Sequence, residues 1–130
     1  MKKFIPMLLS ALMLTGCAGA GNSTGNTYRQ ISMDQAVAMM EKESGYIILD
    51  VRRPDEFVAG HIPGAVNVPN ESIGKDEIVE LPNKGQLILV YCRSGRRSKE
   101  AAEKLVKLGY TNIVEFGGIL DWKGETVTEG

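Results

Sequence analysis

The sequence predicts an α/β fold in which helices cover both faces of an open parallel sheet of about five strands. Segments typical of strands alternate with segments typical of helices along most of the chain. Two strand segments, 46–51 and 87–91, are strongly apolar and lack polar alternation, as expected for strands covered on both faces. The chain has 130 residues, of which 43% are hydrophobic, so it is long enough to form one globular domain.

The first half of this domain carries patterns for three strands and two helices. Ser32 and Gln35 form a capping box that opens a helix ending near residue 42. Pro54 suits the first turn of a short helix over 55–59. The predicted strands of this half are residues 28–31, 46–51 and 66–68.

The second half predicts two more strands, one long helix and two less regular segments. In chain order these are a weak helical pattern at 72–81, a strand at 87–91, a helix at 97–108, a strand at 113–116 and a short helix carrying Trp122. The apolar side chains of the long helix fall on one face, which predicts that this face packs against the sheet. Trp122 is expected in the core.

The loop between the strand 87–91 and the following helix has the composition of a reactive site. Cys92 stands where a strand ends and a helix begins, so backbone N–H groups and the helix dipole favour its thiolate form. Three arginines within five residues add positive charge, namely Arg93, Arg96 and Arg97. A lone cysteine is often an inert buried side chain, and arginines often mark a solvated helix start. Because the cysteine and three arginines occur together in this loop, we expect Cys92 to be a nucleophile.

Several motifs in the same order resemble those of single-domain rhodaneses. The similarity covers about residues 28–124 and depends on Asp50-Val51-Arg52, Glu56-Phe57, the segment from Gly60 to Pro69, the loop from Cys92 to Arg97, and Gly117-Gly118 with Trp122. The resemblance implies a rhodanese-like fold and transfer of sulfur from thiosulfate to cyanide or a thiol, through a persulfide on Cys92. It implies no cofactor.

The same resemblance assigns roles within the loop. Arg93 and Arg97 match the two cationic positions of the family's loop pattern, and Gly95 permits the close approach of the backbone. We expect the anionic sulfur donor to bind to Arg93, Ser94, Gly95, Arg96 and Arg97. Thiosulfate is a dianion, and guanidinium groups can pair with its oxygens. A thiolate already formed needs no general base, which agrees with the presence of a single histidine.

Four further residues are predicted to support the site structurally. Asp50 with Arg52, or Arg52 with Glu56, suits an ion pair that brings no chemistry of its own. His61 precedes a turn and is expected to fix it by hydrogen bonds. One imidazole without a second histidine or a nearby cysteine is a poor metal site, so no metal is predicted.

The N-terminal residues carry the pattern of an exported bacterial lipoprotein. Residues 1–16 combine a positive start with an apolar segment, and Leu14-Thr15-Gly16-Cys17 resembles a lipobox, so we expect a signal peptide and lipidation of Cys17. An ordinary secretory signal with a chance cysteine is the alternative. Residues 17–27 would form a lipid-anchored flexible tether, and residues 28–130 the domain. The lipids, rather than a helix, would then hold the protein to a membrane.

Two other functions remain open at this point. Related phosphatases and arsenate reductases separate cysteine and arginine by five residues, and that position is Ser98 here, so the shorter loop disfavours phosphate. A binding module or sulfur carrier that serves one protein acceptor is the other alternative. Nucleic acid is not an expected partner, because the formal net charge is −1 and no polybasic patch is present.

Overall fold

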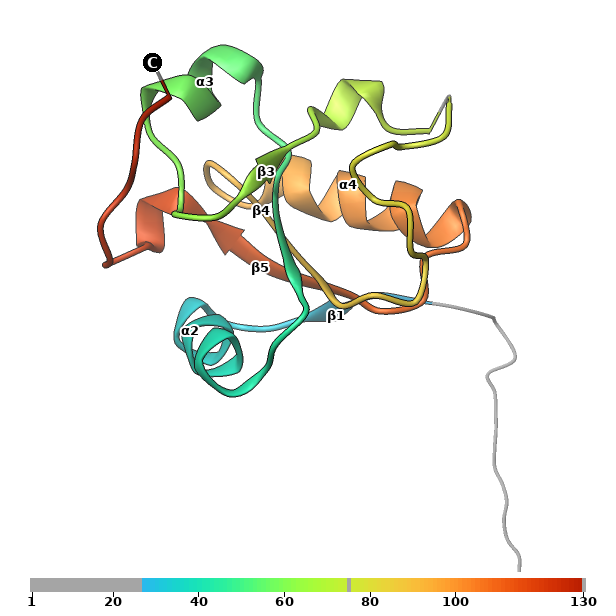
Figure 1. Cartoon of the computed structure of the whole chain (residues 1–130), viewed down its shortest axis with the longest axis horizontal. Helices are drawn as coiled ribbons and strands as arrows, with labels where there is room; N and C mark the ends of the chain where they lie inside the picture. Colours follow the sequence, from blue (N-terminus) through green and yellow to red (C-terminus); the bar gives the residue numbers. More distant parts are fainter. Residues whose placement is uncertain (1–26, 75, 130) are drawn as a thin grey trace, which may run out of the picture.

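The computed structural model describes residues 27–74 and 76–129 (Figure 1). The predictions for the signal peptide, for Cys17 and for all but the last residue of the tether lie outside this part of the chain. The strands are β1 (Arg29–Gln30), β2 (Ile47–Asp50), β3 (Val66–Asn67), β4 (Ile88–Cys92) and β5 (Ile113–Gly118). The α-helices are α2 (Met33–Lys42), α3 (Pro54–Ala59) and α4 (Arg96–Lys107), with 3-10 turns η3 (Asn70–Ser72) and η4 (Ile119–Asp121). None of the helices in the described ranges is long and apolar enough to cross a membrane.

The five strands form one parallel sheet in the order β1-β5-β4-β2-β3. The two apolar segments of the sequence, β2 and β4, are therefore neighbours inside the sheet. In their register Ile48 lies beside Leu89 and Asp50 beside Tyr91. Because all strands are parallel, their C-terminal ends meet at one edge, where a site is expected in folds of this kind.

Helices cover both faces of the sheet, which confirms the predicted fold class. On one face α4 packs Ala101, Ala102 and Leu105 against side chains of the central strands. On the other face α2 contributes Ala36, and the half-buried Phe57 of α3 packs against the same cluster. Figure 1 shows α2 and α4 on opposite sides of the sheet. The central strands β2 and β4 are mostly apolar because each of their faces is covered.

The helix boundaries follow the local signals in the sequence. The Ser32 side chain accepts a hydrogen bond from the Gln35 N–H at 3.1 Å, and the Gln35 side chain accepts one from the Ser32 N–H at 2.9 Å. This is the predicted capping box, and α2 begins directly after its N-cap residue Ser32. Pro54 occupies the first turn of α3, and Gly60 caps its end.

The prediction of a helix at 72–81 is wrong. Only the turn η3 is helical there, and the following residues that the structure describes, 73–74 and 76–81, are irregular. Gly74 adopts a φ of 113°, which ends any helix. Burial of Ile73, Ile78 and Leu81 in the core on the α4 side holds the segment in place instead. Tertiary packing therefore overrides a weak local pattern.

Trp122 also differs from its prediction. It follows η4 rather than lying within it, and it is half-buried at the edge of the core on the α2 side. Its indole N–H donates to the backbone oxygen of Glu125 at 2.9 Å. The side chain covers the core and keeps its polar edge near the surface, as is common for tryptophan.

Candidate active site

The loop predicted to be reactive lies at the C-terminal edge of the sheet. Cys92 is the last residue of β4, and the loop leads directly into α4, whose cap is Gly95. Gly95 has a φ of 116°, in the left-handed region that favours glycine. This conformation lets the backbone fold back over the sulfur. The first turn of α4 has N–H groups without partners inside the helix, and this positive end of the helix dipole adjoins the loop of Cys92.

The sulfur of Cys92 is in contact with one group of its own loop and one of α4. The Gly95 N–H donates to Cys92 Sγ at 3.0 Å, and Ser98 Oγ lies 3.5 Å from the same sulfur. The cysteine is only 1% exposed. A sulfur that accepts a backbone N–H bond at a helix N-terminus is well placed to carry negative charge.

The arginines of the loop line a hollow of about 470 Å³ next to the segment that carries this cysteine, although Cys92 itself is not among its lining residues. The hollow is bordered by Arg53, Glu56, Glu71, Arg93, Ser94, Arg96 and Arg97. Arg93 is exposed and enters none of the ion pairs among the described residues, whereas Arg96 pairs with Glu100 on the outer surface of α4. Positive groups thus predominate at the mouth of the site, and an anion of modest size fits there.

Arg97 is fixed by a carboxylate from another part of the chain. Its two terminal nitrogens donate to the two oxygens of Glu56, at 2.7 and 3.1 Å. These bonds hold the pKa of the Glu56 carboxyl at about 2, against a weaker opposing effect of burial. Glu56 therefore pairs with Arg97, and the predicted alternative of an Arg52–Glu56 pair is wrong. Two of the five N–H bonds of Arg97 are used within the described part of the chain, and the other three have no acceptor there, so they can bind a ligand.

Replacing Glu56 with glutamine is expected to lower the free energy of unfolding by about 1 kcal/mol near neutral pH, because solvent screens this partly exposed pair. A lowered pKa in the folded state stabilises the protein above the ordinary value of 4.5, and the effect disappears as pH falls toward 2. Denaturant unfolding of both proteins between pH 7 and pH 2 measures the difference. Glu100→Gln, which breaks the exposed pair with Arg96, is the matched control. A difference that persists unchanged at pH 2 would contradict this interpretation.

Asp50 and Arg52 form the predicted ion pair, and Tyr91 completes it. Arg52 lies 2.7 Å from Asp50 Oδ2 and also donates to the Gly60 oxygen at 2.7 Å. The Tyr91 hydroxyl donates to Asp50 Oδ2 at 2.7 Å and accepts from the Ile62 N–H at 3.1 Å. Burial would lower the pKa of Arg52, but Asp50 outweighs it and the pKa is raised. Burial and then Asp50 raise the pKa of Tyr91, so its hydroxyl stays protonated.

His61 lies behind the site rather than in it. Its ring stacks on Phe57 with 3.7 Å between ring centroids, and Nδ1 lies 2.8 Å from the Phe57 oxygen. The backbone of His61 pairs with Val127, which attaches the C-terminal segment beside α3 (Figure 1). Asp50, Arg52 and His61 thus support the turn after α3, while Glu56 reaches the loop through Arg97.

Three residues of the site were missed by reasoning from the sequence. Ser98 and Glu115 are buried beneath Cys92, and the Ser98 hydroxyl lies 2.5 Å from Glu115 Oε2. Gly118 lies against the loop, because a Cβ atom built on it would stand 2.0 Å from the Arg93 oxygen. A glutamate inside a strand covered on both faces was a signal available in the sequence, since such a residue is rarely buried without a reason.

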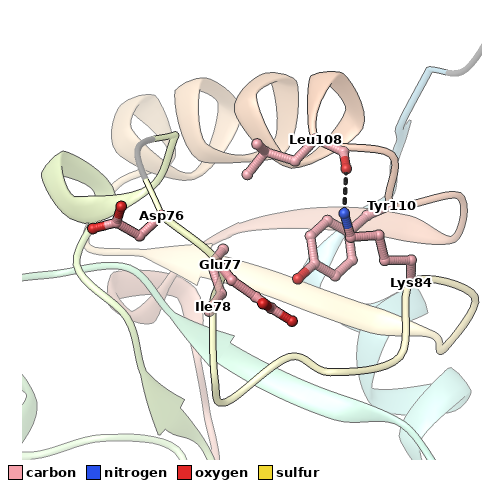
Figure 2. Close-up of a pocket in the computed structure, with 6 residues that line it drawn as sticks. All are labelled: Asp76, Glu77, Ile78, Lys84, Leu108 and Tyr110. Atoms are coloured by element: carbon pink, nitrogen blue, oxygen red, sulfur yellow. Dashed lines mark hydrogen bonds between the residues drawn. The ribbon is translucent and has the colours of Figure 1, made fainter.

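A second hollow, of about 430 Å³, lies at the other end of α4 (Figure 2). Lys84 is one of its lining residues. Its ammonium group donates to the Leu108 backbone oxygen at 2.7 Å, at the C-terminus of that helix. The ammonium also lies 5.4 Å from the centre of the Tyr110 ring. Lys84 therefore caps the helix and packs on an aromatic ring. With Asp76, Glu77 and Ile78 as its other lining residues, this hollow holds no nucleophile comparable to Cys92.

Comparison with known proteins identifies the family. Residues 32–125 match the rhodanese-like domain. The chain belongs to the rhodanese-like family. It is 36% identical over 73 residues to the thiosulfate sulfurtransferase PspE of Escherichia coli, covering 56% of this chain and 70% of that protein. It is 35% identical over 98 residues to the putative sulfur carrier protein YrkF of Bacillus subtilis, covering 75% of this chain but only 52% of that protein.

A solved structure supports the same assignment for the fold. The structure described as rhodanese with anions from E. coli superposes with a TM-score of 0.59 at 32% identity, covering 64% of this chain and 98% of that one. Membership of this rhodanese-like family supports sulfur transfer as the general class of activity. The donor, the acceptor and the intermediate have to be argued from the site.

Proposed function

We propose that this rhodanese-like protein is a thiosulfate sulfurtransferase that carries sulfur as a persulfide on Cys92. The Cys92 thiolate attacks the outer sulfur of thiosulfate, so that a new sulfur–sulfur bond forms. The original sulfur–sulfur bond breaks, and sulfite leaves with its electron pair. A nucleophilic acceptor, cyanide or a thiol, then takes the terminal sulfur and returns Cys92 as a thiolate. No redox partner is needed in either step.

The observation that carries this proposal is a sulfur that accepts the Gly95 N–H in a loop whose arginines line a hollow. The N–H bond stabilises negative charge on Cys92 and on the persulfide that replaces it. Arg93 and the free donors of Arg97 supply positive charge for the oxygens of thiosulfate and of departing sulfite. The names of PspE and YrkF, a sulfurtransferase and a putative sulfur carrier, support the same chemistry.

The position of Ser98 argues against a phosphatase or an arsenate reductase. In those proteins an arginine stands there and binds the tetrahedral anion. Here the Ser98 side chain is completely buried and points to Glu115, away from the hollow. Phosphate would therefore lack a guanidinium at the position where such chemistry requires it.

Thiosulfate treatment is expected to add the mass of one sulfur atom to the peptide that contains Cys92, and cyanide should remove it with release of thiocyanate. Intact-mass and peptide mass spectrometry measure this change. Cys92→Ala should abolish the adduct and reduce thiocyanate formation by at least about 10³-fold, because the nucleophile is gone. Cys17→Ser is the matched control and should load sulfur normally.

Two results would overturn this assignment. If the folded protein gains no sulfur from thiosulfate, a binding module or a carrier loaded only by a protein donor is favoured. Turnover of a phosphoryl substrate that disappears in Cys92→Ala would favour the phosphatase alternative.

We propose separately that the chain is exported and anchored to a bacterial membrane through lipid on Cys17. The support is the lipobox-like sequence that ends at this residue. Labelled palmitate should enter the full chain in bacterial cells, and Cys17→Ser should abolish the labelling. An unlabelled wild-type chain in the cytoplasmic fraction would contradict the proposal.

A further inference from the structure

Glu115 is a buried carboxyl group to which the proposed mechanism gives no role. It lies in β5 beside Val90 of β4, on the α4 face of the sheet, and is 2% exposed. It enters none of the ion pairs among the described residues. Its oxygens meet the Gly117 N–H at 2.8 Å, the Gln30 amide at 3.4 Å and the Ser98 hydroxyl at 2.5 Å. A buried carboxylate without a cation is costly, and the groups that meet this one are neutral donors.

Ser98 connects this carboxyl to the reactive sulfur. Its oxygen lies 2.5 Å from Glu115 Oε2 and 3.5 Å from Cys92 Sγ. The backbone oxygens of Gly95 and Gly117, at 2.9 and 3.3 Å, can only accept. A hydroxyl has one hydrogen to donate. The donors within reach of Ser98 Oγ are therefore the Cys92 thiol and a protonated Glu115.

This geometry allows two arrangements that differ in the place of one proton. With Glu115 ionised, the Ser98 hydrogen points to the carboxylate and the Cys92 thiol donates to Ser98. With Glu115 protonated, the carboxylic acid donates to Ser98, and the Ser98 hydrogen turns toward the sulfur, which is then a thiolate. The thiol proton passes to Ser98 as the hydroxyl proton passes to Glu115, so the net charge of the three groups stays at −1.

We propose that Glu115 is a positioning residue that controls the charge on Cys92 through the direction of the Ser98 hydroxyl. Ionised Glu115 holds Cys92 as a thiol, and transfer of the thiol proton through Ser98 to Glu115 leaves Cys92 as the reactive thiolate. The inference concerns the same site as the proposed sulfurtransferase and adds a proton-dependent control to it. Because Cys92 is 1% exposed, this internal route also gives its proton a destination other than solvent.

Other charged groups around this pair act on it as well. Arg97 faces Cys92 from α4, and its pKa is raised first by hydrogen bonds to Glu56 and, less strongly, by charge on Cys92. Tyr28 lies near Glu115 at the start of the domain. Its pKa is raised mainly by burial and further by Glu103 and Glu115. Glu103 on α4 is exposed, so it offers a carboxylate of equal charge without contact to Ser98.

The experiment measures how fast iodoacetamide alkylates Cys92 as a function of pH, read on the peptide that contains this residue. Glu115→Gln removes the negative charge that attracts the Ser98 hydrogen and can keep an oxygen as acceptor for the Gly117 N–H, so the Ser98 hydroxyl is freer to turn toward sulfur. We expect the pH midpoint of alkylation to fall by about one unit, which raises the rate below the midpoint about tenfold. Glu103→Gln should leave the midpoint unchanged.

A second comparison tests the route through Ser98. In a Ser98→Ala background, Glu115→Gln should shift the midpoint by clearly less than it does in the wild-type background, because the hydroxyl that connects the two groups is gone. Equal shifts in both backgrounds would show a direct charge effect and overturn the role of Ser98. If Glu115→Gln unfolds, Glu115→Asp, which keeps the charge and shortens the reach to Ser98, should also lower the midpoint.

An unchanged or raised midpoint in folded Glu115→Gln, with the fold verified by thermal unfolding, would overturn the proposal. Alkylation needs neither thiosulfate nor turnover, so its outcome is independent of the proposed activity. A shifted midpoint without sulfur loading would retain the control of Cys92 and reject the sulfurtransferase. Sulfur loading without a shifted midpoint would retain the sulfurtransferase and reject the control of Cys92 by Glu115.

Discussion

Replacing Gly118 with alanine is expected to reduce sulfur loading of Cys92 by about 10²-fold or more, because the loop that holds the sulfur must move. The added Cβ would stand 2.0 Å from the Arg93 oxygen and 2.5 Å from the Ser94 nitrogen. Both are backbone atoms, so rotation of a side chain cannot relieve the clash. The displacement would carry the Gly95 N–H away from the sulfur. The rate of persulfide formation, followed by mass spectrometry, measures the effect.

The matched control is Gly85→Ala, which adds the same methyl group in a surface loop. There the new Cβ would meet only the Asn83 side chain at 3.6 Å, an ordinary contact. Sulfur loading by this variant should equal that of the wild type. Normal loading by Gly118→Ala would show that the loop and β5 can separate without loss of the site.

Replacing Asp50 with asparagine is expected to lower the free energy of unfolding by about 3–5 kcal/mol, because the buried Arg52 guanidinium loses its counter-charge. Asp50 is completely buried and Arg52 is 5% exposed, so water cannot compensate. Tyr91 would also lose a carboxylate acceptor for its hydroxyl, at 2.7 Å in the wild type. Denaturant unfolding measures the loss, and Asp34→Asn on the exposed face of α2 serves as the control.

A double replacement separates charge from packing. In a background that already carries Arg52→Met, Asp50→Asn should lower the free energy of unfolding by much less, since no buried cation is left unpaired. If the two single losses simply add, the ion pair is not the source of the effect, and Asp50 acts through Tyr91 instead.

Most of the fold was predictable because its signals lie within short stretches of sequence. The capping box of Ser32 and Gln35, Pro54 at the start of α3 and the apolar runs of β2 and β4 are signals read within a few residues. The segment after η3 carries no comparable signal. Its conformation depends on which side chains the core accepts, so the local sequence pattern wrongly predicted a helix there.

The candidate site also has a part that was predictable from neighbouring residues and a part that was not. Cys92, Arg93 and Gly95 lie within four consecutive residues, and their approach follows from a strand that runs into a helix. The partner of Arg97 was not predicted, because Glu56 lies 41 residues away. Tyr91 and Asp50 are also 41 residues apart, and they meet only because β2 and β4 are neighbours in this register.

The sequence by itself therefore determined the fold class, most of the helices and strands, and the loop with the nucleophile. These depend on periodicity, capping and turn chemistry, which act over one or two turns of chain. The tertiary structure alone decided which carboxylate fixes Arg97, why Gly118 has no room for a side chain, and that Glu115 lies beneath Cys92 with Ser98 between them. These contacts follow from the order and register of the strands, and the close packing around them leaves each buried polar group only the partners that the sheet brings near.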